Sequence, residues 1–288
     1  MLDPQTGFAV GNNTLLATTD AGKTWKSVAA GGGHDLTSIR CLDPKTCLLT
    51  TVKGDVLLRT SDGGQTAIEI TPSSQPIFAA AFASPSRVAA VGANGATVVS
   101  DDAGVNYTPI SHDIGGRYFD LRPGPNAGSV LALGDKGGLA LTIDAGASWK
   151  TLAVPTSTSI SDAAFPSSAT GYALDDKGGL FKSANGGNSW QTLNSGTTAR
   201  PSALVAPAPD TIVLVGPRGI RRAVGATPFA KVGGKAVAKA TLSAATLERA
   251  PSPPGTRARS TCSSRPTRVR AGRRSSYRRR PTRTAPSS

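Results

Sequence analysis

The chain has 288 residues with 33 Gly and 21 Pro but only two Glu, Glu69 and Glu248, and its formal net charge is +14. Scarce Glu and Gly-punctuated runs of β-branched residues exclude a mainly helical protein, and no stretch approaches the apolar length of a transmembrane helix. The charge lies at one end: residues 246–288 hold 12 Arg and one Glu, whereas residues 1–245 hold 20 Lys and Arg against 17 Asp and Glu. Overall charge is therefore no argument for nucleic-acid binding by the body.

The first elements in the chain are two short apolar runs, 8–11 and 14–18, followed by the segment Thr18-Thr-Asp-Ala-Gly-Lys-Thr-Trp25. This eight-residue segment, termed the box below, recurs without gaps at 60–67, 100–107, 142–149 and 183–190. Its third positions, separated by 42, 40, 42 and 41 residues, are Asp20, Asp62, Asp102, Asp144 and Asn185. Such regular spacing indicates an internal repeat of about 41 residues.

The composition of the box predicts a turn. The Asp or Asn side-chain oxygen can accept backbone N–H groups of its own turn. A glycine suited to positive φ follows two positions later, at Gly22, Gly64, Gly104, Gly146 and Gly187. An aromatic residue that can pack between neighbouring units ends the box, at Trp25, Tyr107, Trp149 and Trp190. Ala67 replaces the aromatic in the second unit, which predicts a looser junction there. Because the box recurs in five successive units, we assign its Asp residues to turn stabilisation rather than to an active site.

The stretches between boxes predict four antiparallel strands per repeat. One apolar run ends in a Gly-type turn before each box, a second leads into the box, a third follows it, and a fourth opens the next unit. Around the fourth box the first three are 130–134, 138–141 and 149–153, and the run 77–82 opens the third unit. Four antiparallel strands in each repeat are typical of a β-propeller blade, so the predicted fold class is all-β.

The first and last units are incomplete. The first lacks its opening strand, and the sixth, at about 200–234, has strands but no box. A further run, Ala236-Val-Ala-Lys-Ala-Thr-Leu242, could supply the missing opening strand, because a propeller must join its first and last blades or leave strand edges exposed. We therefore predict a β-propeller of six recognisable blades over residues 1–245, with a truncated seven-bladed propeller as the alternative.

Residues 246–288 form a second region with a different composition. They are rich in Arg, Pro, Ser and Thr, contain no Lys and show no periodicity, so we expect a disordered tail. Two interpretations stay open. The tail could be a basic arm for nucleic acid or anionic surfaces, densest at 278–280. It could also be an out-of-frame end, since a GC-rich gene translated in the wrong frame tends to yield Arg, Pro, Ser, Ala and Thr.

The three cysteines are Cys41, Cys47 and Cys262. Cys41 and Cys47 flank a five-residue segment, Leu-Asp-Pro-Lys-Thr, in which a turn would bring two strands together. The pair could then form a disulfide or remain as two thiols, and export would favour the disulfide.

Residues outside the boxes give little indication of catalysis. Four carboxylates at irregular positions are compatible with a two-carboxylate glycosidase, namely Asp113, Asp120, Asp162 and Asp210. Glu69 lies on an outer strand, and Tyr107 and Tyr172 occupy repeat positions typical of packing. His34 and His112 are isolated, and no Cys or His spacing suggests zinc, so neither metal nor cofactor is predicted.

Basic residues cluster at one place in the body, at Arg218, Arg221 and Arg222. This cluster would suit an acidic protein partner, or it could be a solvated strand edge.

The pairing of Gly7-Phe-Ala-Val-Gly11 with Thr18-Thr-Asp-Ala-Gly-Lys-Thr-Trp25 resembles the BNR/Asp-box propellers, and over residues 1–245 it is most similar to the photosystem II stability/assembly factors. That resemblance implies a seven-bladed, extracytoplasmic, non-enzymatic chaperone for partner subunits. The same box occurs in sialidases, xyloglucanases and sortilin-type receptors, so it specifies the fold better than the function. The Arg-Ile-Pro motif of sialidases is absent, and the start MLDPQTGFAV has no signal-peptide pattern.

The predicted function is a non-enzymatic scaffold that binds a protein partner through blade loops. The alternative is a sialidase- or xyloglucanase-like glycoside hydrolase with a carbohydrate ligand. Nucleic-acid binding is expected only through the tail, and the sequence does not indicate an oligomeric state. The resemblance and the Cys41–Cys47 pair favour an extracytoplasmic location.

Overall fold

The computed structural model describes residues 4–111, 114–196, 200–217, 219–225 and 227–232. The chain divides into two compact units, 1–247 and 248–288, and every described residue belongs to the first. The tail at 246–288 and the strand expected at 236–242 lie outside the described residues. No helix in the described part of the chain is long and apolar enough to cross a membrane.

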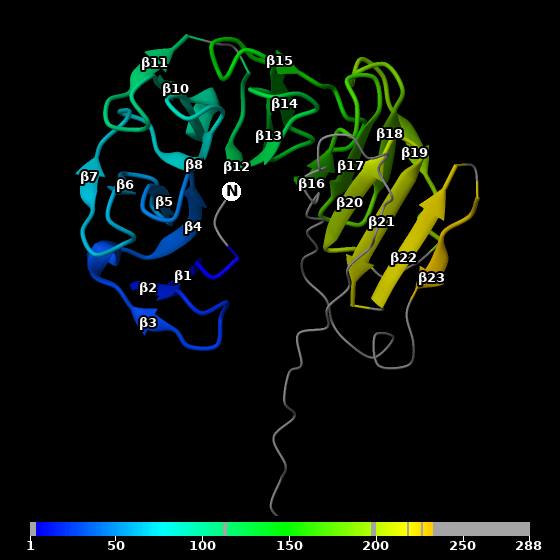
Figure 1. The fold of residues 1–288 in the computed structure, drawn as a ribbon. Helices are drawn as coiled ribbons and strands as arrows, with labels where there is room; N and C mark the ends of the chain where they lie inside the picture. Colours follow the sequence, from blue (N-terminus) through cyan, green and yellow to red (C-terminus); the bar gives the residue numbers. More distant parts are fainter. Residues whose placement is uncertain (1–3, 112–113, 197–199, 218, 226, 233–288) are drawn as a thin grey trace, which may run out of the picture. The chain divides into compact units, whose positions relative to one another are not determined.

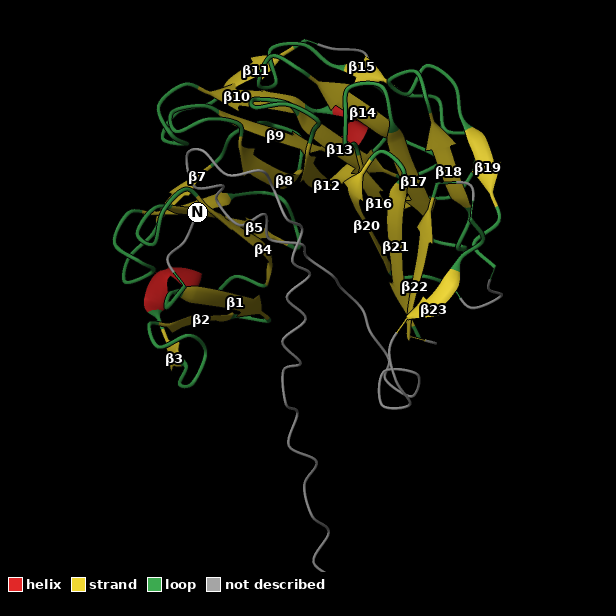
Figure 2. Cartoon of the chain, turned by 45° about the vertical axis from the view of Figure 1, so that its right-hand side comes forward, coloured by secondary structure: helices red, strands yellow, loops and turns green. Residues whose placement is uncertain are grey.

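The described residues form short strands and two three-residue 3₁₀ helices, η1 (Ala29–Gly31) and η2 (Ala93–Gly95), as the ribbon in Figure 2 shows. The strands make six antiparallel sheets, each a meander in chain order, and we number these sheets as blades 1 to 6. The predicted all-β propeller is confirmed, and among the described residues blade 1 has no opening strand, as the sequence predicts.

Blade 1 has three strands and the other blades have four. Blade 1 comprises β1 (Gly7–Gly11), β2 (Thr14–Thr18) and β3 (Lys26–Ser27). Blade 2 comprises β4 (Leu36–Cys41), β5 (Cys47–Thr51), β6 (Leu57–Thr60) and β7 (Ile68–Ile70). Blade 3 comprises β8 (Ile77–Phe82), β9 (Val88–Gly92), β10 (Thr97–Ser100) and β11 (Thr108–Ile110). Blade 4 comprises β12 (Tyr118–Pro123), β13 (Val130–Gly134), β14 (Leu139–Thr142) and β15 (Lys150–Thr151). Blade 5 comprises β16 (Ile160–Ala164), β17 (Gly171–Asp175), β18 (Leu180–Ser183) and β19 (Gln191–Leu193). Blade 6 comprises β20 (Ala203–Ala208), β21 (Thr211–Gly216), β22 (Gly219–Val224) and β23 (Ala230–Val232).

Successive blades meet through their inner strands. The contacts follow chain order, from β1 to β4, β5 to β8, β8 to β12, β13 to β16 and β16 to β20. Figure 1 shows the first strands of blades 2 to 6, which we call opening strands (β4, β8, β12, β16 and β20), toward the centre of the arrangement. The last strands, called closing strands (β7, β11, β15, β19 and β23), lie outside. The opening strands of blades 2 to 6 therefore line the channel side of the propeller, where a binding site is expected.

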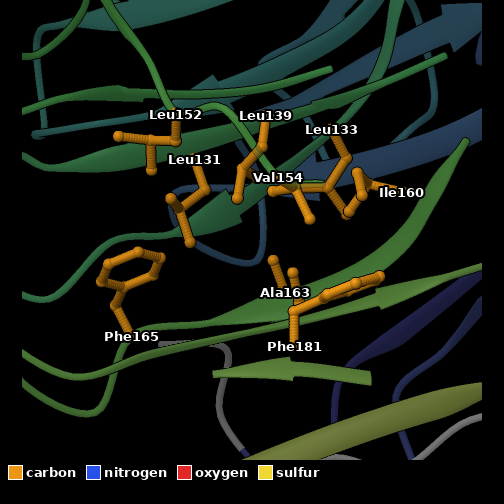
Figure 3. Close-up of a cluster of buried hydrophobic side chains, with 10 residues drawn as sticks. Leu131, Leu133, Leu139, Leu152, Val154, Ile160, Ala163, Phe165 and Phe181 are labelled. Carbon is orange, nitrogen blue, oxygen red and sulfur yellow. The ribbon is translucent and has the colours of Figure 1, made fainter. Parts of the chain in front are cut away.

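Apolar side chains between the blades form the core. Neighbouring strand residues point to opposite faces of the sheet, so Leu131 and Leu133 of β13 face blade 5 whereas Ala132 faces blade 3. Between blades 4 and 5, Leu131 and Leu133 share one buried cluster with Phe165 and Phe181, as Figure 3 shows. Burying each such leucine contributes about 2 kcal/mol, so the contacts between blades position the channel-lining strands.

Candidate functional site

The first candidate site is the set of box turns. In blade 1, the Thr18 hydroxyl donates to Asp20 Oδ1 over 2.7 Å and accepts the Gly22 N–H at 3.0 Å. Asp20 Oδ1 also accepts the Thr24 N–H at 2.9 Å, and Asp20 Oδ2 accepts the Thr24 hydroxyl at 2.6 Å. The same arrangement recurs around Asp62, Asp102 and Asp144, with Asn106 and Ser148 in place of threonine at the second partner position of the last two boxes.

These bonds hold the box carboxylates in their ionised form. The Thr24 side chain, followed by the Thr24 N–H, lowers the pKa of Asp20 to about 2. The corresponding bonds from Thr66 lower the pKa of Asp62 to about 2. Both oxygens of each carboxylate accept hydrogen bonds from donors of their own turn, which favour the ionised form. The turn-stabilising role proposed from the sequence agrees with this geometry.

The box glycines have positive φ, for example +80° at Gly22 and +85° at Gly187. The residue before the glycine is also left-handed, even where it is alanine, with φ of 59° at Ala21 and 57° at Ala145. Its N–H is fixed by a carbonyl in the preceding loop of the same blade, such as that of Gly128 for Ala145. The left-handed conformation of these alanines is not predictable from the sequence, because alanine rarely adopts a positive φ.

The box aromatics lie between blades. The Trp190 ring meets the Phe165 ring edge-on, with centroids 6.0 Å apart, in the core between blades 4 and 5. The polar atoms Tyr107 Oη, Trp149 Nε1 and Trp190 Nε1 are buried without a hydrogen-bond partner among the described residues. Burial raises the pKa of Tyr107, and Tyr172 Oη donates to the Pro209 carbonyl at 2.9 Å. Both tyrosines therefore have packing environments rather than those of a nucleophile.

Blade 6 replaces the box with a different turn. The Thr227 hydroxyl donates to the Val224 carbonyl at 2.6 Å and accepts the Val224 N–H at 3.1 Å. Phe229 then packs against the cluster that contains Tyr172 and Leu180 of blade 5. Phe229 thus occupies the place of the box aromatic, which the missing Asp had concealed in the sequence.

The second candidate site is a charged network on the channel-lining strands. Asp120 of β12 accepts from Arg40 Nη2 of β4 at 3.3 Å and pairs with Arg122 Nη1 of its own strand. Arg122 Nε donates to Asp162 Oδ1 of β16 at 3.2 Å. Asp162 Oδ2 accepts the Leu204 N–H of β20 at 2.8 Å. The network therefore joins blades 2, 4, 5 and 6.

Strand register explains why this network forms. The opening strands of blades 2 to 5 each have a bulge near their start, and the position just after it is Ser38, Ala79, Asp120 or Asp162. In blade 6 the equivalent position, defined by pairing with the second strand, is Ala203. Two residues later, blade 2 has Arg40 and blade 4 has Arg122, whereas blade 3 has Ala81. Small side chains in blade 3 leave room for Arg40 to reach Asp120.

Asp162 is the carboxylate in the network with a raised pKa. Burial is the largest cause, and it outweighs the Leu204 N–H and the Arg122 guanidinium, which both lower the pKa. The Asp162 side chain is 11% exposed, against 26% for Asp120. Two carboxylates from the irregular set thus come together, each bound to the same arginine.

The other predicted titratable residues lie elsewhere. Asp210 accepts the Thr211 hydroxyl at 3.2 Å and lines a hollow of about 390 Å³ between blades 5 and 6. Glu69 on β7 pairs with His34 Nε2 at 2.9 Å. Asp113 and His112 are outside the described residues. Within the described ranges, no three His, Cys, Asp or Glu residues gather as a metal site.

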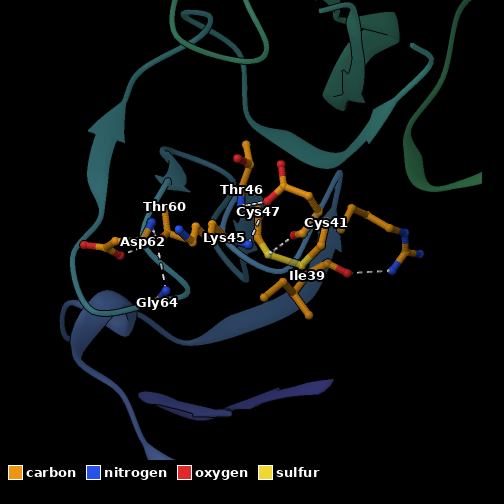
Figure 4. The surroundings of a disulfide bond; sticks show 10 residues. Ile39, Cys41, Lys45, Thr46, Cys47, Thr60, Asp62 and Gly64 are labelled. Atoms are coloured by element: carbon orange, nitrogen blue, oxygen red, sulfur yellow. Dashed lines mark hydrogen bonds between the residues drawn. A yellow bond between two sulfur atoms is a disulfide. The ribbon is translucent and has the colours of Figure 1, made fainter. Parts of the chain in front are cut away.

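Cys41 and Cys47 are cross-strand partners in the hairpin of β4 and β5, and a disulfide joins them (Figure 4). Between them, Asp43 Oδ1 accepts the N–H groups of Thr46 and Lys45 at 2.8 Å and 2.7 Å. These bonds, led by that from Thr46, lower the pKa of Asp43. The turn and the disulfide thus fix the same hairpin.

Two residues of the predicted basic cluster, Arg221 and Arg222, are among the described residues of blade 6. Arg221 and Arg222 are consecutive residues of β22, so they point to opposite faces of the blade. Arg218 lies outside the described residues. The two arginines are adjacent in the sequence, but the alternation of side chains along a strand places them on different faces of the blade.

No protein-family model matches the chain, and no curated protein matches it at a significant level. Solved structures do match. A structure of YCF48 bound to D1 peptide aligns over 83% of this chain and 82% of its own, with a TM-score of 0.65 and 19% identity. YCF48 from Cyanidioschyzon merolae aligns over 82% and 83%, with a TM-score of 0.64 and 18% identity.

A GH74 enzyme from Niastella koreensis aligns over 73% of this chain but 33% of its own, with a TM-score of 0.51 and 19% identity. At these identities the similarity establishes the fold. The chain has a β-propeller fold like those of YCF48 and the GH74 enzyme, and the resemblance inferred from its boxes is confirmed at the level of the fold.

Proposed function

We propose that this chain is a non-enzymatic β-propeller that binds a protein partner through the loops joining its strands. The observation that supports this most directly is the state of its carboxylates. The box carboxylates accept hydrogen bonds from donors of their own turns, and the channel carboxylates Asp120 and Asp162 form ion pairs with Arg122. A glycosidase needs one carboxyl that can reach its substrate as an acid and another as a base or nucleophile.

The similarity to YCF48 bound to D1 peptide supports a peptide segment as the ligand. A propeller presents loops at both ends of its blades, so a partner could engage either end. The Cys41–Cys47 disulfide supports an oxidising, extracytoplasmic setting for that partner.

Two exposed apolar residues allow the ends to be compared. Val52, 55% exposed, lies in the β5–β6 turn, and Ile143, 71% exposed, lies in the box turn at the opposite end of blade 4. A peptide that binds the full chain is first selected from a displayed library, and its affinity is then measured for the chain with Val52→Asp and for the chain with Ile143→Asp. We expect one of these two variants, and not the other, to bind the peptide at least tenfold more weakly than the parent chain. Unchanged melting of the variants is the control, and equal affinity for both variants and the parent would contradict loop binding.

A glycoside hydrolase is the second candidate, because the propeller fold is shared with a GH74 enzyme and Asp162, with its raised pKa, binds the same arginine as Asp120. Incubating the full chain with xyloglucan, β-glucan and sialosides tests it. We expect no turnover. Hydrolysis that disappears in Asp162→Asn, while the melting temperature is kept, would establish the enzyme and reject the scaffold.

A further inference from the structure

Strand β1 has an unoccupied edge. It pairs with β2 on one side, and no described strand pairs with it on the other. The strands at the same place in blades 2 to 5 are β5, β9, β13 and β17, and all five residues of each are buried. None of the five residues of β1 is buried. Strand β1 is therefore more exposed than its counterparts, each of which has an opening strand along the corresponding edge.

The outer faces of the first and last blades are uncovered as well. A Cβ on Gly187 would lie 2.8 Å from Leu152 of the preceding blade, whereas a Cβ on Gly22 would meet only Trp25 of its own turn. Trp25 is 44% exposed. On blade 6, Val224 and Val232 are 37% and 41% exposed. Both faces thus expose apolar side chains, and Trp25 lacks the neighbouring core against which Tyr107, Trp149 and Trp190 pack.

Connection lengths indicate which segment could fill the edge. From a closing strand to the next opening strand, the chain uses between six residues, 71–76, and nine residues, 194–202. The closing and opening strands of one blade are about 14 Å apart, and three extended residues span only about 10 Å. The run 236–242 begins three residues after β23 ends at Val232, which is too soon for this crossing. A connection of nine residues, 233–241, brings the chain to Leu242.

The sequence from that point has the pattern of an opening strand. Leu242-Ser-Ala-Ala-Thr-Leu247 has an apolar residue at each end and small or polar residues between them. Ile160-Ser-Asp-Ala-Ala-Phe165 and Ile77-Phe-Ala-Ala-Ala-Phe82, which contain β16 and β8, share the apolar ends and the small residues at the fourth and fifth positions.

We propose that residues 242–247 pair with β1 as the opening strand of blade 1 and close the propeller at six blades. Blade 2 supplies the register. There Cys41 lies opposite Cys47, and Ile39 lies opposite Leu49. Because Gly7 pairs with Thr18 as Cys47 pairs with Thr60, Ala9 corresponds to Leu49. The register then places Leu247 opposite Gly7, and Ala245 opposite Ala9.

A disulfide trap tests this register in the full chain. The pair Ala9→Cys with Ala245→Cys stands two residues along from the position of the native Cys41–Cys47 bond, on the same face of the sheet. The matched control, Ala9→Cys with Ala244→Cys, places the second thiol on the opposite face. Both variants are made with Cys262→Ser and oxidised under identical conditions.

We expect the first pair to form an intramolecular bond at least tenfold faster than the control, as mapped by mass spectrometry of non-reduced peptides. Equal rates for the two pairs would overturn the proposal. Bonds only between molecules would also overturn it and would assign the edge to a second copy of the chain.

Truncation provides a second, independent measurement. We expect a chain ending at Leu247 to melt at the same temperature as the full chain, and a chain ending at Thr241 to melt at least about 5 °C lower, because only the second loses the strand. Equal melting temperatures for the two truncated chains would contradict the proposal.

Discussion

At the scale of single residues, the box is a hydrogen-bonding device that tolerates a neutral acceptor. Asn185 keeps the essential contact, since its Oδ1 accepts the Ser189 N–H at 2.9 Å and the Ser183 hydroxyl at 3.0 Å. Its Nδ2 donates to Ser189 Oγ at 2.9 Å, which reverses the polarity of the bond that a box Asp accepts. The side-chain oxygen, rather than the charge, is therefore the common requirement of the five turns.

This comparison predicts different outcomes for two substitutions of Asp144. Asp144→Ala leaves the Ser148 N–H and the Thr142 hydroxyl without their acceptor, and should lower the free energy of unfolding by about 1–2 kcal/mol. Asp144→Asn keeps the oxygen and should cost less than about 0.5 kcal/mol. Urea denaturation of both variants measures the difference, and equal losses would show that the oxygen is not what the turn requires.

The box carboxylates also predict an acid-sensitive stability. The pKa of Asp20 and of Asp62 is about 2 in the folded chain, below the ordinary value of 3.8. Their contribution is complete above about pH 4 and is lost as the pH falls through 2. Asp162 acts in the opposite direction, because its raised pKa favours folding at low pH. The urea midpoint should therefore fall between pH 4 and pH 2, and less steeply in the variant with Asp20→Asn and Asp62→Asn; parallel curves would refute this.

At the scale of the element, periodicity made the strands and turns predictable. The spacing of the boxes fixed which runs form strands, and the three-stranded blade 1 followed from counting those runs. The aromatic role of Phe229 was not predictable, because its turn is held by Thr227 instead of Asp. The facing directions of Arg221 and Arg222 required the strand assignment first. Local sequence patterns thus predicted the strands and turns. They did not predict a turn of similar shape that different residues stabilise, as in blade 6.

Close approach between blades predicts a steric cost at the box glycines. Gly146 has φ +90°, and a Cβ there would lie 2.9 Å from Ala89 and 3.0 Å from Val99 of blade 3. Gly128, in the same blade, has φ +77° with nothing within 4 Å. Both alanine substitutions should cost about 1–2 kcal/mol for the left-handed backbone, and Gly146→Ala should cost a further ~1–3 kcal/mol for overpacking. Equal losses in chemical denaturation would mean that the blades do not pack this closely at the box.

At the scale of the whole molecule, the channel network is what the sequence could not reveal. Arg40 and Asp120 are 80 residues apart, and Arg122 and Asp162 are 40 apart. Asp120 and Asp162 do occupy equivalent positions in two repeats, but Ser38, Ala79 and Ala203 occupy the others, so no periodic signal marks the site. Only the closeness of the opening strands brings the charges together. The contact therefore depends on the tertiary arrangement and not on any single repeat.

Removing Arg122 should weaken the channel more than removing Arg40. Arg122→Met leaves the largely buried Asp162 without its cation and should cost about 3 kcal/mol at pH 7. Arg40→Met, the matched control, removes a more exposed partner of Asp120 and should cost less than about 1 kcal/mol.

Loss of Arg122 also raises the pKa of Asp162 further, because the guanidinium lowers it in the parent chain. Asp162 in the variant then takes up a proton more readily as the pH falls, and its buried charge disappears. The deficit of Arg122→Met relative to the parent should therefore shrink from pH 7 to pH 4, as measured by urea denaturation at both values. A deficit that is the same at both pH values, or as large for Arg40→Met, would show that the arginine acts by packing and not by balancing the charge of Asp162.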